Sequence, residues 1–193
     1  DSLDFSAFRR NPKWLIGYSD ITVLHSHIHN FGIESLHAQM PLELNTKSEA
    51  TAESIFKVLF GKNHQIDCTA ESEVANRNGN ATGSLIGGNL SLLYSLMGSI
   101  SEIDTKGKIL FIEDLDEMLY HLDRMMMLLK RSGKLENLAG LIVGGMNDMR
   151  DNTIPFGKTA NEIIQDAIKE YSFPVSYGFH AGHIKDNRAL IMG

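Results

Sequence analysis

A serine near the start of the chain stands between an apolar stretch and a helix-forming stretch. Residues 13–18 read KWLIGY, which predicts a short buried strand, and residues 21–30 follow with the pattern of a helix. Ser19 therefore falls on the turn, where its hydroxyl would be exposed beside the unpaired N–H groups of the helix. This arrangement suits a nucleophile, with the N–H of Asp20 as an oxyanion donor. The alternative is that Ser19 or Asp20 only caps the helix.

Two acids follow a second apolar stretch. Residues 108–112 read KILFI and predict a buried strand, and Glu113 and Asp114 come directly after it. In open α/β sheets, functional groups collect at the carboxyl ends of strands. A carboxylate there can accept the N–H of an imidazole and fix its tautomer. The alternative is that both acids cap the helix expected over residues 117–131.

Two histidines lie in one glycine-containing turn near the end of the chain. The turn reads GFHAGH over residues 178–183 and follows a strand predicted at 174–177. A histidine at a strand end can act as a general base. From these residues alone, His180 and His183 are both candidates, and either could instead be a surface residue.

Three more histidines share the helix that follows Ser19. His25 and His29 have the i, i+4 spacing of zinc ligands, with His27 between them, but the stretch lacks the Glu of the H-E-x-x-H pattern. We therefore interpret these histidines as part of an ordinary helix face and expect no metal site.

A glycine pair precedes the helix expected over residues 90–97. Gly88 and Asn89 at the start of that helix could hold an anion, because helix N-termini present free N–H groups. The stretch lacks the lysine of a P-loop and the full G-x-G-x-x-G pattern. We expect no nucleotide and no other cofactor.

The composition is that of an ordinary globular protein. The 193 residues are 42% hydrophobic and 22% charged, with a formal net charge of -6. Scattered Lys and Arg residues and a negative charge argue against nucleic-acid binding. No apolar run approaches the roughly 20 residues of a membrane span. The one cysteine, Cys68, excludes an intramolecular disulfide framework and favours a reducing compartment, and we expect a cytoplasmic location.

Strands and helices are predicted to alternate, which indicates an α/β protein. The order strand, helix, strand over residues 13–40 predicts a βαβ unit and a parallel sheet. Residues 62–80 are polar, form a loop by composition and are a candidate domain boundary. Further strands are expected at residues 34–40, 81–86, 138–143, 174–177 and 188–192, and further helices within residues 45–61 and at 156–171.

Five stretches, taken together, resemble the L,D-carboxypeptidase family of serine peptidases. This family includes murein tetrapeptide carboxypeptidases and microcin C immunity peptidases. The resemblance implies that Ser19 is the nucleophile, Glu113 the triad carboxylate and His183 the base. The stretches are PKWLIGYSDITVL (12–24), GSLIGGNLSLL (83–93), GKILFIEDLDE (107–117), LAGLIVGG (138–145) and GFHAGHIKDN (178–187).

The chain departs from the family pattern in loops that shape the pocket. It reads HAQM over residues 37–40 where the family has His-Gly-Pro-Met, and it has His180 and Ile184 where the family often has proline and glycine. These departures bear on the substrate more than on the triad. We expect His37, Gly88 and Asn89 to contact the substrate.

A basic side chain must also meet the substrate's carboxylates. Arg124, Arg150 and Arg188 are equal candidates for this role.

The resemblance also implies that the chain is an N-terminally truncated member. Residues 1–45 would be the end of a parallel-sheet, Rossmann-like N-terminal domain that carries the nucleophile, and residues 46–80 a linker helix and loop. Residues 81–193 would be a mixed α/β C-terminal domain that carries Glu113 and His183. Family members carry roughly a further half-domain before the first strand, including a glycine-rich turn that donates to the oxyanion. Loss of one oxyanion donor typically lowers the rate by about 10²–10³. A fragment of this kind would be inactive by itself although its triad residues are present.

The implied function is serine carboxypeptidase activity that releases terminal D-alanine from murein tetrapeptide, without a cofactor and in a possible homodimer. Two alternatives remain open. The first is an immunity-type peptidase that cleaves a peptidyl or aminoacyl nucleotide. The second is a non-catalytic binding protein that uses the Ser19 turn as a ligand pocket.

Overall fold

Strands and helices alternate along most of the chain in the computed structural model, which describes residues 3–68 and 76–193. The strands are β1 (Ile16–Gly17), β2 (Ser35–His37), β3 (Leu85–Asn89), β4 (Ile109–Leu115), β5 (Gly140–Asn147), β6 (Val175–Ser176) and β7 (Leu190–Met192). The helices are α1 (Ser6–Arg10), α2 (Thr22–His29), α3 (Glu49–Leu59), α4 (Leu90–Ser95), α5 (Leu119–Arg131) and α6 (Ala160–Ala167). The expected α/β class is confirmed.

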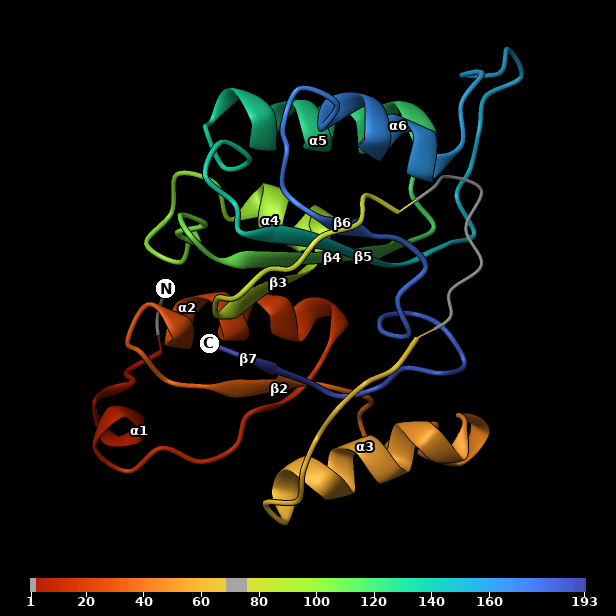
Figure 1. Cartoon of the computed structure of the whole chain (residues 1–193). Helices are drawn as coiled ribbons and strands as arrows, with labels where there is room; N and C mark the ends of the chain where they lie inside the picture. Colours follow the sequence, from red (N-terminus) through yellow and green to blue (C-terminus); the bar gives the residue numbers. More distant parts are fainter. Residues whose placement is uncertain (1–2, 69–75) are drawn as a thin grey trace.

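The strands form two sheets stacked on each other (Figure 1). One sheet has the order β1-β2-β7 and the other the order β3-β4-β5-β6. Helix α2 lies between the sheets, α3 covers the outer face of the first, and α4, α5 and α6 cover the outer face of the second (Figure 1). In the part of the chain that the structure describes, no helix combines the length and the apolar character needed to cross a bilayer.

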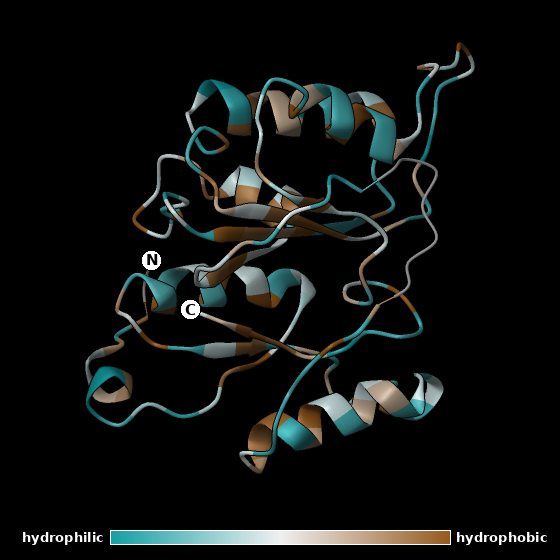
Figure 2. Ribbon diagram, viewed as in Figure 1, coloured by the Kyte–Doolittle hydropathy of each residue, from teal (hydrophilic) through white to brown (hydrophobic). Residues whose placement is uncertain are grey.

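The second sheet is parallel, with its strands in chain order. Right-handed crossovers between neighbours in such a sheet place every connecting helix on the same face. Helices on one side and the first sheet on the other bury β4 on both faces, and Leu110, Phe111 and Ile112 are all fully buried. Figure 2 shows these central strands as hydrophobic ribbons, whereas the covering helices mix hydrophobic and hydrophilic positions.

The first sheet combines distant parts of the chain. Strand β1 pairs with β2 in parallel, and β7, the last strand of the chain, pairs with β2 in the antiparallel direction. Residues 190–192 therefore extend the sheet of the 1–45 segment, so the two predicted segments share one sheet. The division into 1–45, 46–80 and 81–193 stays a prediction.

Several predicted elements have different ends in the structure. The helix expected over residues 156–171 begins only at Ala160, because Thr159 and Glu162 form a capping box. Strand β3 begins later than expected and continues through the glycine pair to Asn89, so Gly88 lies in a strand and not in a turn before the helix. Residues 69–75 of the loop predicted over 62–80 lie outside the described residues.

Candidate active site

Ser19 lies on a sharp turn between β1 and α2. Its φ is 59°, in the left-handed region that non-glycine residues rarely adopt, at the start of a 3-10 turn over Ser19–Ile21. Gly17 permits this turn, because a Cβ there would lie 2.7 Å from the Cγ1 of Ile21. The cap positions of the 3-10 turn and of α2 are Tyr18 and Ile21, and neither makes a side-chain cap. The capping interpretation of Ser19 and Asp20 is therefore not supported, and the strained turn has the geometry of a nucleophile elbow.

Asp20 follows Ser19 inside the first turn. The first N–H groups of a helix have no partner within that helix, so the N–H of Asp20 is available to an oxyanion beside Ser19. The carboxylate of Asp20 belongs to an exposed residue. Its role as an oxyanion donor stays a prediction.

Glu113 and His183 are in direct side-chain contact. The Nδ1 of His183 lies 2.7 Å from the Oε2 of Glu113, and the backbone N–H of His183 donates to the same oxygen at 3.2 Å. Glu113 is fully buried, and the side chain of His183 is 14% exposed. The contact occupies Nδ1 and leaves Nε2 as the ring nitrogen that can exchange a proton with a reacting group.

The surroundings of His183 favour its protonated form. Burial lowers the pKa of His183, but its hydrogen bond to Glu113 and the charges of Glu113 and Asp114 outweigh burial and raise the pKa above its ordinary value. The imidazole is therefore a stronger base than a free histidine and holds a proton more readily during a reaction.

Tyr18 connects the elbow with the histidine. Its ring centroid lies 4.8 Å from that of His183, at an interplanar angle of 52°. Because Tyr18 immediately precedes Ser19, the contact places the His183 ring beside the elbow. The 3-10 turn that contains Ser19 also contacts β3, next to the strand that carries Glu113.

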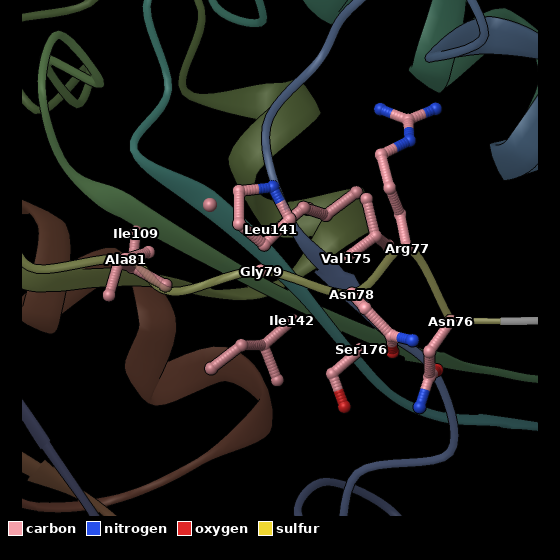
Figure 3. Close-up of a pocket in the computed structure, with 12 residues that line it drawn as sticks. Asn76, Arg77, Asn78, Gly79, Ala81, Ile109, Leu141, Ile142, Val175 and Ser176 are labelled. Atoms are coloured by element: carbon pink, nitrogen blue, oxygen red, sulfur yellow. The ribbon is translucent and has the colours of Figure 1, made fainter.

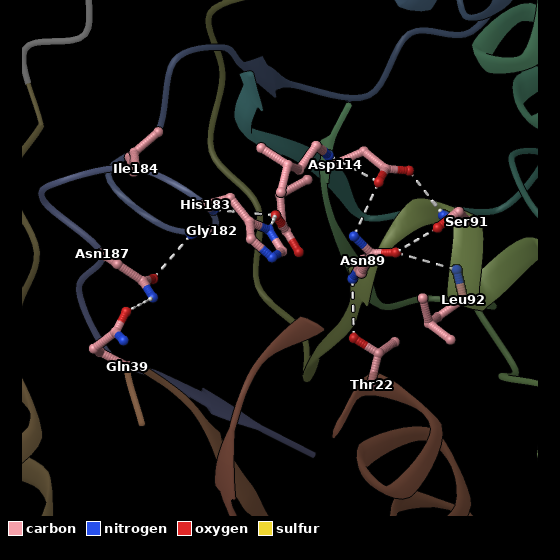
Figure 4. Close-up of polar contacts among 12 residues, drawn as sticks. Thr22, Gln39, Asn89, Ser91, Leu92, Asp114, Gly182, His183, Ile184 and Asn187 are labelled. Carbon is pink, nitrogen blue, oxygen red and sulfur yellow. Dashed lines mark hydrogen bonds and ion pairs between the residues drawn. The ribbon is translucent and has the colours of Figure 1, made fainter. Parts of the chain in front are cut away.

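Asp114 binds the segment where β3 ends and α4 begins. It does not cap α5, whose N-cap is Met118. Its Oδ1 accepts from the Nδ2 of Asn89 at 3.0 Å, and its Oδ2 accepts from the N–H of Ser91 at 2.9 Å (Figure 4). Burial raises the pKa of Asp114 to about 6, although the N–H of Leu115 favours the charged form. The interpretation of the two acids as caps of the helix after them is therefore not supported.

His180 makes a different contact from His183. Its Nδ1 lies 2.8 Å from the Oδ2 of Asp186, within the same loop. The structure thus joins Glu113 to His183 and not to His180. The catalytic roles of Ser19, Glu113 and His183 stay predictions.

His25 has structural partners within its own half of the molecule. Its Nδ1 lies 2.7 Å from the hydroxyl of Ser35 and its Nε2 lies 3.0 Å from the carbonyl oxygen of Gly17. Residues 3–68 and 76–193 contain no group of three or more His, Cys, Asp or Glu side chains that could hold a metal ion.

The three residues expected to contact the substrate lie deeper than that role suggests. His37 is fully buried, and neither of its ring nitrogens has a hydrogen-bond partner among the described residues. The side-chain oxygen of Asn89 caps α4 and its amide donates to Asp114. Gly88 allows close packing, because a Cβ there would lie 2.5 Å from the Oγ1 of Thr22. Their contact with a substrate stays a prediction.

A buried amide supports the loop that carries His183, and sequence reasoning missed it. Asn187 is fully buried; its Oδ1 accepts from the N–H of Gly182 at 2.9 Å, and its Nδ2 donates to the Oε1 of Gln39 at 3.4 Å (Figure 4). Burial raises the pKa of Tyr18 overall, although the side chain of Gln39, which lies near that of Tyr18, lowers it. Asn187 thereby connects the residue before His183 with Gln39, which lies beside the elbow. Asn187 stood in a stretch that resembles the family, which was the one available signal.

A separate pocket of about 250 Å³ lies away from these residues (Figure 3). It is formed by the segment that contains Arg77 and by the beginnings of β4, β5 and β6. The guanidinium of Arg77 donates to the carbonyl oxygens of Ile168, Tyr171 and Phe173, so it ties this segment to the region after α6. The pocket lining does not include Ser19, and its residues offer no arrangement for proton transfer.

Two family descriptions match the chain. The LD-carboxypeptidase N-terminal domain matches residues 1–38, and the LD-carboxypeptidase C-terminal domain matches residues 82–193. A probable murein peptide carboxypeptidase of Bacillus subtilis is 38% identical over 203 residues, which cover 99% of this chain and 61% of that protein. The microcin C7 self-immunity protein of Escherichia coli is 28% identical over 223 residues, which cover 99% of this chain and 64% of that protein.

A solved structure has the same fold. The muramoyltetrapeptide carboxypeptidase from Oxalobacter formigenes matches with a TM-score of 0.83 and 26% identity, over 99% of this chain and 66% of that chain. The chain thus spans less than two thirds of the length of these relatives.

Proposed function

The chain belongs to the LD-carboxypeptidase family, and from this premise we propose that it forms the catalytic part of a serine carboxypeptidase. The proposed reaction releases the terminal D-alanine of murein tetrapeptide by hydrolysis of an L,D-peptide bond. The names of the Bacillus and Oxalobacter relatives support this substrate class. The proposed location is the cytoplasm.

The proposed reaction has two halves. In the first, His183 Nε2 takes the proton of the Ser19 hydroxyl while Oγ bonds to the peptide carbonyl carbon. The N–H of Asp20 stabilises the resulting oxyanion. The carbon–nitrogen bond then breaks as His183 returns the proton to the leaving amine.

In the second half, water replaces the amine. His183 takes a proton from the water, whose oxygen bonds to the acyl carbon, and returns it to Ser19 Oγ as the ester bond breaks. Glu113 holds the ring by Nδ1 and stabilises the imidazolium that forms in each half.

The observation that carries the proposal is the position of one imidazole. The His183 ring is bonded to Glu113 on one side and packs against Tyr18, the neighbour of the strained Ser19, on the other. Three residues far apart in sequence are thereby brought into one region. A buried carboxylate, a histidine with a raised pKa and a serine on a sharp turn are the groups that the proposed triad requires.

Tetrapeptide hydrolysis by the full-length protein tests the proposal. Release of D-alanine would be measured for the wild type, Ser19→Ala and His183→Ala, with Ser132→Ala at the end of α5 as a matched serine control. We expect each triad variant to lose about 10⁴-fold or more in kcat, and the control to keep the wild-type rate. Full activity in Ser19→Ala would refute the assignment.

An immunity-type activity is the second candidate, because the microcin C7 self-immunity protein is 28% identical to the chain. Such an enzyme would use the same triad on a peptidyl or aminoacyl nucleotide. The murein relative is more similar, at 38%, which favours the murein peptide. A panel of tetrapeptide and aminoacyl-nucleotide substrates distinguishes the two, and labelling of Ser19 by a fluorophosphonate would argue against a non-catalytic binding protein.

A further inference from the structure

A carboxypeptidase must recognise a negative charge close to the bond that it breaks. The leaving nitrogen and the terminal carboxylate of the substrate are attached to the same carbon atom. If His183 protonates that nitrogen, the carboxylate must lie near the imidazole as well. A cation beside His183 would therefore distinguish a free C-terminus from the interior of a peptide.

The three arginines considered from the sequence have other partners. Arg150 pairs with Asp116 at 2.9 Å, and Arg188 pairs with Asp186 at 2.8 Å. Arg124 lies over an aromatic ring on its own helix. Each of these guanidinium groups is therefore already engaged by another group of the protein.

Lys47 places an ammonium beside the His183 loop. Its Nζ donates to the carbonyl oxygen of Ile184, the residue after His183, at 3.0 Å. Its charge is close enough to oppose protonation of the His183 ring. Among the described residues, no carboxylate lies within ion-pair distance of this ammonium, so two of its three donors are available.

The backbone beside Lys47 is fixed against the same loop. Ser48, the N-cap of α3, donates its N–H to the carbonyl oxygen of Lys185 at 3.1 Å and its hydroxyl to Asp186 Oδ1 at 2.7 Å. These bonds hold the start of α3 at a set distance from His183. Residues 39–81 lie between the two family matches, so Lys47 is a feature of this chain outside both matched domains.

We propose that Lys47 binds the free carboxylate of the substrate's terminal residue and so selects peptides that end one residue after the cleaved bond. The inference rests on the proposed carboxypeptidase function. The ammonium would attract the carboxylate while the bond to Ile184 holds the lysine beside the leaving group. No sequence pattern indicated this role, because the segment reads as a linker.

Binding to a Ser19→Ala background tests the inference without turnover. The ligands are murein tetrapeptide with a free terminal carboxylate and the same peptide with a C-terminal amide, measured by titration calorimetry in the full-length protein. Adding Lys47→Met should weaken binding of the acid by about 10- to 100-fold and leave the amide unchanged. Lys57→Met, which removes an exposed charge farther along α3, should leave both affinities unchanged.

Three outcomes would overturn the inference. Lys47→Met could leave the preference for acid over amide intact, or weaken both ligands equally, which is the result of a purely structural role. Alternatively, the weaker binding of the acid could result from Lys185→Met, which removes another lysine of the His183 loop, and not from Lys47→Met. Hydrolysis by the wild type is a separate measurement. If the protein binds the acid through Lys47 but releases no D-alanine, the proposed function is refuted and the inference about Lys47 stands.

Discussion

The ring of Tyr18 lies 4.8 Å from the imidazole of His183, measured between centroids. This contact joins an early segment of the chain to a late one. Tyr18 belongs to the elbow after β1, whereas His183 belongs to the loop before β7. The same loop is bonded to Glu113 in the second sheet. The candidate triad thus depends on the packing of one sheet against the other.

Glu113→Gln should lower the activity and should also shift the acidic limb of the pH profile of kcat/KM to lower pH. A neutral His183 is required as base, so kcat/KM should fall as the pH drops below the raised pKa of His183. The amide removes the charge that raises this pKa, so the acidic limb should move to lower pH. The plateau should fall by about 10²–10⁴-fold because the imidazolium loses its carboxylate. An unchanged acidic limb in the pH profile of kcat/KM would contradict the assigned role of Glu113.

Ser19→Gly should be more stable than Ser19→Ala, although both lose the hydroxyl and should be inactive. The left-handed conformation at φ 59° strains a residue with a Cβ and costs glycine little. We expect the free energy of unfolding of the glycine variant to exceed that of the alanine variant by about 1 kcal/mol, measured by urea denaturation. Equal stabilities would show that the turn stores no such strain.

Gly88→Ala should disrupt the contact between the two halves. The new Cβ would lie 2.5 Å from the Oγ1 of Thr22, and the residue has a φ of 139°. We expect a loss of about 3 kcal/mol or more in the free energy of unfolding, together with lower activity. Gly98→Ala is the matched control, since its φ is also positive but no atom lies near the added Cβ, and it should cost only about 1–2 kcal/mol.

His37 should make the protein less stable in acid. Burial and the neighbouring His25 lower its pKa from 6.5 to about 3, so the unfolded chain binds a proton that the folded chain excludes. The free energy of unfolding should therefore fall as the pH drops below 6.5, by up to about 1.4 kcal/mol per pH unit, until the pH nears 3. In His37→Leu this slope should shrink in a pH series of urea titrations.

A second histidine variant controls the His37 measurement. His64 binds the carbonyl oxygen of Ala189 through its Nε2. Replacing it by glutamine tests whether loss of any histidine flattens the profile. An identical slope in the wild type and His37→Leu would mean that another group causes the acid sensitivity.

Local signals in the sequence predicted most elements of the fold but not all of their ends. Apolar runs located the buried strands because burial on both faces requires continuous hydrophobic residues. The ends of elements depended on contacts without a local pattern. Strand β3 continues through Gly88 because a residue without a Cβ can pack closely against α2 at that position.

The sequence alone determined the alternation of strands and helices, the α/β class, and three chemically suitable residues at turns or strand ends. These features follow from short-range periodicity and from residue type. Only the tertiary structure decided that Glu113 contacts His183 and not His180, that β7 joins the first sheet, and that Lys47 lies beside the histidine loop. Those contacts join residues far apart in the chain. They arise when the two sheets pack, and no local pattern of residues encodes such a distance.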